Sequence, residues 1–281
     1  MAKALATVLI GDRYVQEWQR WFRPSWEAYA QRHGYEIVVL TDYIDKTPRA
    51  RERSPNWQKL LILETAELSR FEHVVWLDSD VMVNFHRAPC IVEAHASDLV
   101  GLVSDRVQTW ENPERHDNVL RRIVPLDGRP ASFAEQYRLA ELPTGVEDYS
   151  NTGVMVLRRH HREVLRHVYD EYRETPGSAK EETPLSYHLY KNDLVKPLDP
   201  RFNRTWVSEL VHHYPFLYYP STRTSPAGPP LLTLCVNTAW HNCWFLHFTA
   251  EMCRSQGQSF CLRDDVAYVW PQCHDPLLLQ L

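Results

Sequence analysis

One apolar segment of this chain, residues 73–83, is interrupted by two carboxylates that stand one residue apart. It reads HVVWLDSDVMV, so Asp78 and Asp80 divide a strand-like run into two parts. Strand side chains alternate between two faces, so both carboxylates would point the same way if the chain stayed extended. Two acids at the end of a buried strand repel each other and are costly to desolvate. A hard divalent cation, which prefers oxygen ligands, would remove that cost.

A polar turn between two strands would explain the Asp-Ser-Asp sequence equally well. In open α/β sheets, however, ligands commonly bind where strand ends meet loops. The apolar runs on both sides of the two carboxylates, and the motifs further along the chain, favour a metal and ligand site.

The rest of the chain alternates short apolar strands with helical patterns. Strands are expected at residues 4–10, 35–40, 99–103 and 150–157 and through Trp76, and helices at 14–33, 57–68 and 161–174. Pro24 is expected to begin a second helix within the first of these, and Gly34 to end it. This order favours an α/β fold with a mainly parallel sheet covered by helices on both faces.

Two stretches break this alternation. Residues 105–148 combine many charges with tryptophan, proline and glycine, which predicts an inserted loop region. Loops carry binding residues disproportionately, although a variable surface segment is the alternative. The proline-rich stretch 219–230 predicts either a lid or a long connection.

Five segments, in order, resemble motifs of nucleotide-sugar-dependent glycosyltransferases with the GT-A fold. Residues 73–83 resemble the DxD motif, in which an apolar strand and an aromatic residue lead into Leu-Asp-x-Asp. The other four are SPNWQKLLIL at 54–63, YSNTGVMVL at 149–157, EETPLSY at 181–187 with PRFN at 200–203, and FLHF at 245–248. The chain most resembles the retaining, family-8-like and related galactosyltransferase-type enzymes.

The resemblance implies one GT-A-like domain over residues 1–281: a Rossmann-like, mainly parallel sheet flanked by helices. Residues 105–148 would form acceptor-side loops, and residues 250–281 a cysteine-rich C-terminal tail. The implied enzyme moves a hexose-like sugar from a nucleotide-sugar, with a UDP-sugar favoured, to an acceptor, with retention expected. The acceptor, whether glycan, lipid, protein or small molecule, does not follow from the sequence, nor do the donor sugar and the oligomeric state.

Other activities of similar proteins remain as alternatives. One is a nucleotide-sugar-binding protein without transfer, and another is a nucleotidyltransferase of the same fold. Nucleotidyltransferases usually carry a glycine-rich basic loop after the first strand, whereas this chain has only Gly11 there. A glycoside hydrolase would also need paired carboxylates, but would leave the Asn-x-Gly-Val strand unexplained.

The resemblance implies that Asp78, Asp80 and His247 bind a metal ion. Imidazole suits the later divalent metals, so Mn²⁺ is favoured over Mg²⁺. The metal would bridge phosphate oxygens and act as the Lewis acid for departure of the leaving group. For His247, the alternative is a core histidine between Phe245 and Phe248.

Further residues are expected to bind the donor. Lys59 matches the basic residue on the helix before DxD, and Ser79 lies between the two carboxylates. Arg254 is a second candidate for the phosphates, although the family often has Gly-x-x-Lys-Pro where this chain has TAEMCR. A solvated surface arginine is the alternative for Arg254, and the basic loop with Arg49, Arg51 and Arg53 is expected to be solvated.

The remaining candidates surround the reacting sugar. Asn151 offers an amide suited to sugar hydroxyls, and Gly153 would allow close approach of the backbone to the donor, or else mark a strand bulge. Asp148 resembles an acid near the acceptor. Glu181 and Glu182 occupy an acid-Gln segment, so Glu182 would place a carboxylate near the reacting carbon, where it could stabilise positive charge or attack. Two exposed glutamates at a helix start are the alternative.

Composition narrows the class and location of the protein. A net charge of −5 and a pI near 6.3 argue against a general nucleic-acid binder. The sequence has no membrane-length apolar run and no recognisable signal peptide, which predicts a cytoplasmic protein if Met1 is the native start. Five of the six cysteines follow residue 234 without any Cys-x-x-Cys pair, so buried thiols are favoured over disulfides, and zinc binding with nearby histidines stays open.

Overall fold

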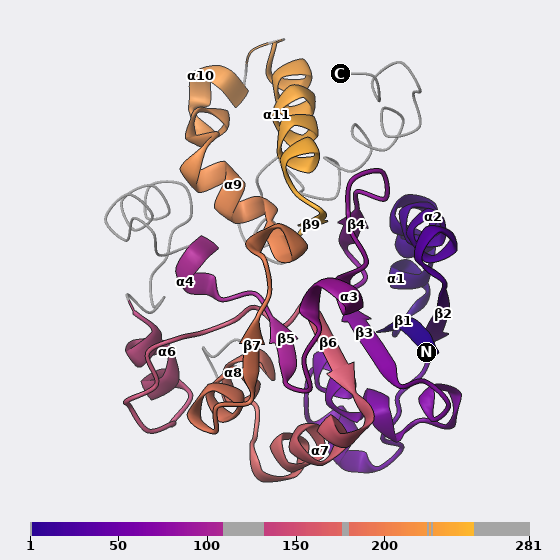
Figure 1. Ribbon diagram of the computed structural model, residues 1–281. Helices are drawn as coiled ribbons and strands as arrows, with labels where there is room; N and C mark the ends of the chain where they lie inside the picture. The colour runs from indigo at the N-terminus through magenta and orange to yellow at the C-terminus, as the bar shows by residue number, and fades with distance from the viewer. Residues whose placement is uncertain (1, 109–131, 176–179, 224, 226, 250–281) are drawn as a thin grey trace.

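A six-stranded sheet forms the centre of the computed structural model, which describes residues 2–108, 132–175, 180–223, 225 and 227–249 (Figure 1). The strand order is β2-β1-β3-β6-β5-β7. Neighbouring strands are parallel except at β6, which is antiparallel to both β3 and β5. The strands are β1 (Lys3–Val8), β2 (Tyr35–Leu40), β3 (His73–Leu77), β5 (Val100–Leu102), β6 (Val154–Arg158) and β7 (Val195–Pro197).

The connection from β1 to β2 is helical, as predicted. It consists of α1 (Asp12–Glu17), a π-helical turn (Trp18–Phe22) and α2 (Arg23–His33). Pro24 lies in the first turn of α2, where its missing N–H costs no helical hydrogen bond. Gly34 ends the helix with a φ of 69°, a left-handed conformation that glycine adopts without strain.

The segment before β3 differs from the prediction of one regular helix over residues 57–68. Two 3₁₀-helices, Pro55–Glu64 and Ala66–Leu68, are separated by Thr65, which is extended at φ −80° and ψ 144°. Six consecutive residues of the first, from Trp57 to Ile62, are buried. Residues 57–62 are therefore buried on all sides, so they lack the exposed polar face of an amphipathic surface α-helix.

The chain does not stay extended through the two carboxylates, so the prediction that strand alternation aligns them is wrong. After β3 a turn closes with the Val81 amide donating to the Asp78 carbonyl at 3.1 Å. β4 (Val81–Val83) then leaves the central sheet and pairs antiparallel with β9 (Phe245–His247). β8 (Arg204–Thr205) completes this second sheet, in the order β4-β9-β8. The turn therefore brings the two carboxylates together at the junction of the two sheets.

Both faces of the central sheet are covered, as the sequence predicts. On β1, Leu5 packs with α2 and the second sheet, whereas Ala4 and Ala6 pack with the 3₁₀ segment 55–64. α7 (Arg162–Glu171) and α8 (Glu182–Lys191) bury Leu165 and Leu185 on this second side. Apolar layers therefore cover both faces of the sheet. The site residues lie at the strand ends on the side of the sheet away from α7.

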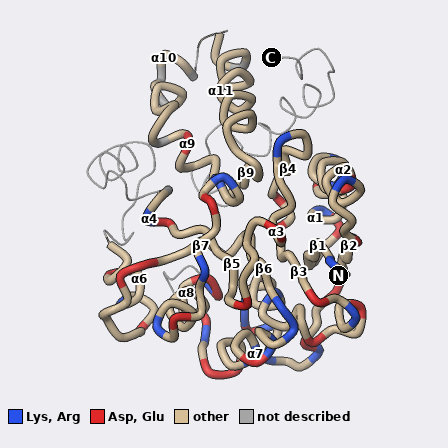
Figure 2. Tube along the Cα trace, viewed as in Figure 1, with Lys and Arg blue, Asp and Glu red and all other residues tan. Residues whose placement is uncertain are grey.

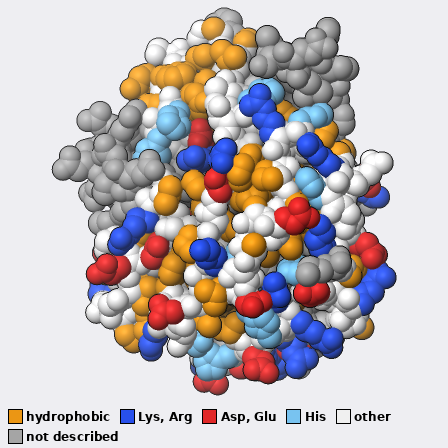
Figure 3. Space-filling model, in the orientation of Figure 1, with side chains coloured by type: hydrophobic (Ala, Val, Ile, Leu, Met, Phe, Trp, Pro, Cys, Tyr) orange, Lys and Arg blue, Asp and Glu red, His pale blue; other side chains and the backbone are white. Residues whose placement is uncertain are grey.

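The C-terminal helices stand beyond the second sheet, at the end of the molecule away from α7 (Figure 1). They are α9 (Trp206–His212), α10 (Pro220–Arg223) and α11 (Gly228–Asn242). α10 and the start of α11 lie within the proline-rich stretch 219–230. Hydrophobic side chains gather over this end (Figure 3), where Tyr219 and Leu234 are 57% and 62% exposed.

Shorter elements complete the described chain. The helices are α3 (Ile91–His95), α4 (Asp105–Gln108) and α6 (Phe133–Leu139), with 3₁₀ turns at Pro48–Arg51, Arg159–His161, Pro200–Asn203 and Pro215–Tyr218. α4 and α6 belong to the stretch 105–148 that was expected to form loops. Residues 109–131 of that stretch, and the tail 250–281 with Arg254, lie outside the described residues.

The basic loop is not simply solvated, which corrects a prediction. Arg49 and Arg53 donate to the Tyr169 carbonyl at the end of α7, with N–O distances of 2.9 and 2.6 Å. Arg53 also donates to the Tyr172 carbonyl at 2.7 Å. These guanidinium groups satisfy carbonyls that a helix end leaves without partners.

The distribution of charges, the state of the described cysteines and the hydropathy of the helices can be compared with what the composition predicts. Basic and acidic residues are interspersed along the described chain (Figure 2). Cys90, Cys235 and Cys243 are buried free thiols, and the described residues contain one group able to hold a metal, which includes no cysteine. Among the helices of the described chain, none has the length and hydropathy needed to span a bilayer.

Candidate active site

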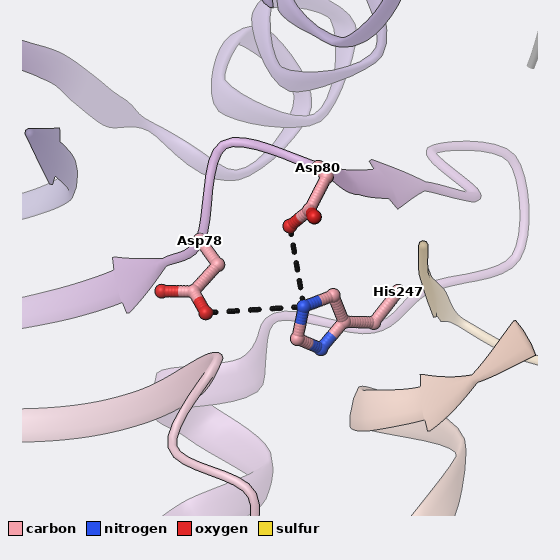
Figure 4. Close-up of side chains that lie close together, drawn as sticks. All are labelled: Asp78, Asp80 and His247. Carbon is pink, nitrogen blue, oxygen red and sulfur yellow. Dashed lines mark ion pairs between the residues drawn. The ribbon is translucent and has the colours of Figure 1, made fainter. Parts of the chain in front are cut away.

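Asp78, Asp80 and His247 converge where β3 ends and the second sheet begins (Figure 4). Asp78 follows β3, Asp80 precedes β4, and His247 is the last residue of β9. The His247 Nε2 atom lies 3.2 Å from Asp80 Oδ1 and 3.8 Å from Asp78 Oδ2. All three ligand atoms lie within 4.8 Å of one another. Two carboxylates and an imidazole at this separation fit a divalent cation.

The orientation of His247 is set by two asparagines. Its Nδ1 atom lies 3.0 Å from Asn203 Oδ1, while Asn203 Nδ2 donates to Asn151 Oδ1 at 3.0 Å and to the Asn151 carbonyl at 3.2 Å. Because the amide nitrogen of Asn203 is used by Asn151, its oxygen accepts the Nδ1–H of the histidine. Nε2 is thereby turned toward the carboxylates, as in metal sites where an outer hydrogen bond fixes a histidine ligand.

Gly153 provides the space that the imidazole occupies. A Cβ atom at Gly153 would lie 2.1 Å from His247 Cε1 and 2.6 Å from His247 Nδ1. Its amide donates to Asn151 Oδ1 at 3.0 Å, and its carbonyl accepts from the Asp78 amide at 2.7 Å. The glycine predicted to allow approach of the donor thus allows close approach of a candidate metal ligand.

Asp78 is held by two donors on one oxygen. Lys59 Nζ and Trp76 Nε1 donate to Asp78 Oδ1 at 2.9 and 2.8 Å. The second oxygen, Oδ2, faces His247. One oxygen therefore anchors the carboxylate and the other is directed toward the candidate metal position.

Lys59 lies deeper than a residue expected to meet phosphate directly. Its side chain is 3% exposed, and its ammonium lies 2.9 Å from both Asp78 Oδ1 and Glu181 Oε1. Burial lowers the pKa of Lys59, but the two carboxylates outweigh burial and raise it overall. For Glu181 burial is the larger influence and raises its pKa despite the lysine. We take the lysine as charged, because two acids face it.

The same competition acts on His247. Burial lowers the pKa of the imidazole, yet the Asp80 carboxylate, followed by Asp78, raises it above its usual value. His247 is buried, as the core-histidine alternative expects, and it also faces the two carboxylates, as the metal-ligand prediction expects.

Both carboxylate oxygens of Glu182, which lies next to this cluster, accept hydrogen bonds. Its Oε1 atom accepts from the Tyr149 hydroxyl at 2.7 Å, and its Oε2 atom from Asn151 Nδ2 at 2.8 Å. Burial raises the pKa of Glu182 to about 7, although the Tyr149 hydrogen bond opposes that shift. Asn151 therefore connects the carboxylate predicted to act on the sugar with the asparagine that holds His247.

The other predicted residues are placed as follows. Ser79 is the middle residue of the turn between the two carboxylates. Asp148 accepts from the Ser104 hydroxyl at 2.6 Å and lines a groove of about 480 Å³ between residues 143–148 and the end of α8. The hydrogen bonds of its carboxylate tie Asp148 to Ser104 and to the Tyr149 amide, and not to Glu182.

Four residues near the site are not among those predicted from the sequence: Trp76, Asp105, Tyr149 and Asn203. Asp105 accepts from the Asn151 amide at 3.2 Å, and burial, followed by the nearby Glu182 charge, raises the pKa of Asp105 well above its usual value. Tyr149 directly precedes the Ser-Asn pair of the motif. An acid shortly after a short buried strand is the available signal for Asp105, which begins α4 three residues after β5, whereas Asp78 follows β3 directly.

Comparison with solved structures identifies the fold. A glycosyltransferase involved in the glycosylation of the major capsid of PBCV-1 has a TM-score of 0.51 and 14% identity, over 96% of this chain and 98% of that chain. The chain has the GT-A glycosyltransferase fold. WbbM, a bifunctional glycosyltransferase solved in its apo form, has a TM-score of 0.50 and 14% identity over 99% of this chain and 51% of that chain. No protein-family model and no curated protein matches the sequence.

Proposed function

We propose that this protein is a metal-dependent glycosyltransferase that moves a sugar from a nucleotide-sugar, with a UDP-sugar favoured, to an acceptor. The observation that carries the proposal is the convergence of Asp78, Asp80 and His247 at a strand end of the GT-A fold. The acceptor class stays open, and retention of configuration is part of the proposal. Residues 1–281 are proposed to form one domain.

Asp78, Asp80 and His247 would hold the metal, with Mn²⁺ favoured because a nitrogen ligand is present. When bound, the metal supplies positive charge to the diphosphate and Lewis-acid assistance for its departure. Asp80 is 14% exposed and Asp78 26%, so the carboxylates are open to a ligand, whereas His247 is 3% exposed. Two acids would repel a diphosphate in the absence of a cation, which supports metal dependence.

The sugar is proposed to lie between the metal residues and Glu182. Asn151 supports this arrangement, because one end of its amide bonds Glu182 and the other accepts from Asn203. A carboxylate at Glu182 would stabilise positive charge that develops on the reacting sugar carbon, or would attack that carbon. The hydrogen bonds to both of its oxygens hold the group in one orientation before the sugar arrives.

The remaining site residues are proposed to have the following roles, of which only that of Lys59 changes from direct phosphate contact to an indirect one. Lys59 and Glu181 would act on the donor through Asp78, given the buried ion pair that joins them. Ser79 and Gly153 are proposed to border the donor, and Asp148 the acceptor. Arg254 remains a candidate phosphate ligand that lies outside the described residues.

To test the proposal, the protein is incubated with a panel of UDP-sugars and the released UDP is measured by mass spectrometry. The wild type should hydrolyse or transfer at least one member with Mn²⁺, and EDTA or Asp80→Asn should abolish that activity. Asp42→Asn is a matched control, because the Asp42 side chain is 76% exposed and its ion pair is with Lys46. Turnover that survives both EDTA and Asp80→Asn would exclude this metal site, and binding without turnover would favour a nucleotide-sugar-binding protein.

A further inference from the structure

We propose that Tyr149 is a positioning residue that holds the Glu182 carboxylate in its working orientation through a hydrogen bond from its phenol hydroxyl. The inference rests on the proposed function, because Glu182 matters for chemistry only if the sugar reacts beside it. Tyr149 itself would not touch the sugar.

The contacts divide the two oxygens of Glu182 between different donors. The Tyr149 hydroxyl donates to Oε1 at 2.7 Å, while Asn151 Nδ2 and the Thr152 amide bond Oε2 at 2.8 and 3.4 Å. All three donors belong to the segment that leads into β6. Donors on both oxygens prevent rotation of the carboxylate, whereas donors on Oε2 alone would leave Oε1 free to swing.

The tyrosine ring is fixed by an aromatic cluster on α6. Tyr149 is 5% exposed and stacks on Phe133, with ring centroids 5.7 Å apart and an angle of 14° between the planes. Tyr137 packs against it at 5.8 Å, and the Tyr137 hydroxyl donates to the Asp148 carbonyl at 2.6 Å. The ring is therefore ordered without Glu182, so its hydroxyl needs little further ordering to make the bond.

The charges around Glu182 make this bond important near neutral pH. Burial raises the pKa of Glu182 to about 7, the hydrogen bond from Tyr149 lowers it, the Glu181 carboxylate raises it and the Lys59 ammonium lowers it. Asp105 also faces Glu182, and burial raises its own pKa well above the usual value. Burial likewise raises the pKa of Tyr149, so the phenol stays protonated and remains a donor.

Removal of the hydroxyl should therefore shift the ionisation of Glu182. In Tyr149→Phe the ring and its stacking are kept, but the ionised carboxylate loses one donor. We expect the acid limb of the pH profile of kcat for UDP-sugar hydrolysis to move up by about one pH unit, a tenfold change in the protonation constant. At pH 6 kcat would fall by about tenfold, and at pH 9 it would nearly equal that of the wild type, with little change in donor KM.

Tyr137→Phe is the matched control. It removes a buried hydroxyl from the same aromatic cluster, and the partners of that hydroxyl are the Asp148 carbonyl and the Ser186 hydroxyl, not Glu182. This variant should lose some thermal stability and keep the acid limb of the wild type. If both variants leave the limb in place, or both move it equally, Tyr149 has only a packing role and the inference is overturned.

A second measurement does not need activity. The Glu182 side-chain carboxyl carbon can be titrated by ¹³C NMR in Glu-labelled protein and assigned by its absence in Glu182→Gln. Its pKa should be about one unit higher in Tyr149→Phe than in the wild type and unchanged in Tyr137→Phe. An unchanged pKa in Tyr149→Phe contradicts the inference. A shifted pKa in a protein that turns over no UDP-sugar would uphold the contact and count against the proposed function instead.

Discussion

Replacement of Gly153 by alanine should displace His247 and weaken metal binding. The added Cβ would lie 2.1 Å from His247 Cε1, and an ordinary contact begins near 3.4 Å, so the imidazole must retreat by about 1.3 Å. Metal-ligand distances tolerate deviations of only about 0.2 Å. The φ of Gly153 lies outside the left-handed region, so the effect arises from crowding and not from backbone strain.

The size of the effect follows from the hydrogen bonds of the histidine. Retreat of the ring would also disturb its 3.0 Å contact with Asn203. Loss of an outer hydrogen-bond partner alone typically weakens metal binding by about 10- to 100-fold, so Gly153→Ala should weaken Mn²⁺ binding by at least that much. Isothermal titration calorimetry of Mn²⁺ in the presence of UDP measures the change.

Gly101→Ala separates metal binding from general overpacking. Gly101 lies on β5, and its Cβ would lie 2.9 Å from Val156 Cβ and 3.0 Å from Nδ1 of His95 on α3, so this variant also crowds a histidine. Overpacking of this kind costs about 1–3 kcal/mol in either variant. The reasoning is refuted if Gly153→Ala binds Mn²⁺ as the wild type does, or weakens binding no more than Gly101→Ala.

Three further substitutions test separate contacts. Asn203→Ala removes the partner of His247 Nδ1 and should weaken Mn²⁺ binding by about 10- to 100-fold, measured by the same titration; unchanged affinity would show that Asn203 does not orient the histidine. Lys59→Met leaves Glu181, which is 2% exposed, without its cation, and should lower the free energy of unfolding measured in urea by about 3–5 kcal/mol. Adding Glu181→Gln should recover part of that loss, and a loss below about 1 kcal/mol would mean that the ion pair contributes little to stability. The pKa of Glu182 is about 7 in the folded protein, against an ordinary value of 4.5. The stability that Glu182 contributes is therefore complete below pH 4.5, and about 3 kcal/mol of the free energy of unfolding is lost as the pH rises through 7. Glu182→Gln should lack that decline between pH 5 and pH 8 in urea unfolding, and equal slopes for both proteins would contradict the raised pKa.

The alternation of apolar patterns predicted the central sheet well, because burial on both faces leaves a strong signal. The break near Pro24 and the left-handed Gly34 are local backbone effects that a sequence shows directly. The convergence of Asp78 and Asp80 was also predicted, but for a wrong reason. Strand alternation would have kept them in one sheet, whereas β4 pairs with β9, which lies more than 160 residues later in the chain.

Long-range contacts explain what the sequence could not show. The neighbour of Gly153 is His247, and no local pattern predicts that a glycine near β6 makes room for a side chain on β9. Likewise, Lys59 was placed near phosphate by its position in a motif, whereas its contacts are with Asp78 and Glu181. Such pairings depend on how the two sheets meet, which is a property of the whole fold.

The central claim is that Asp78, Asp80 and His247 hold a divalent metal that binds the diphosphate of a nucleotide-sugar. Its most direct test is a crystal of the protein soaked with MnCl₂ and UDP, with diffraction recorded at a wavelength where manganese scatters anomalously. The account predicts one strong anomalous peak within coordination distance of Asp78 Oδ2, an Asp80 carboxylate oxygen and His247 Nε2, in contact with the UDP diphosphate. UDP bound with no manganese at these three side chains, or manganese bound only elsewhere, would contradict it.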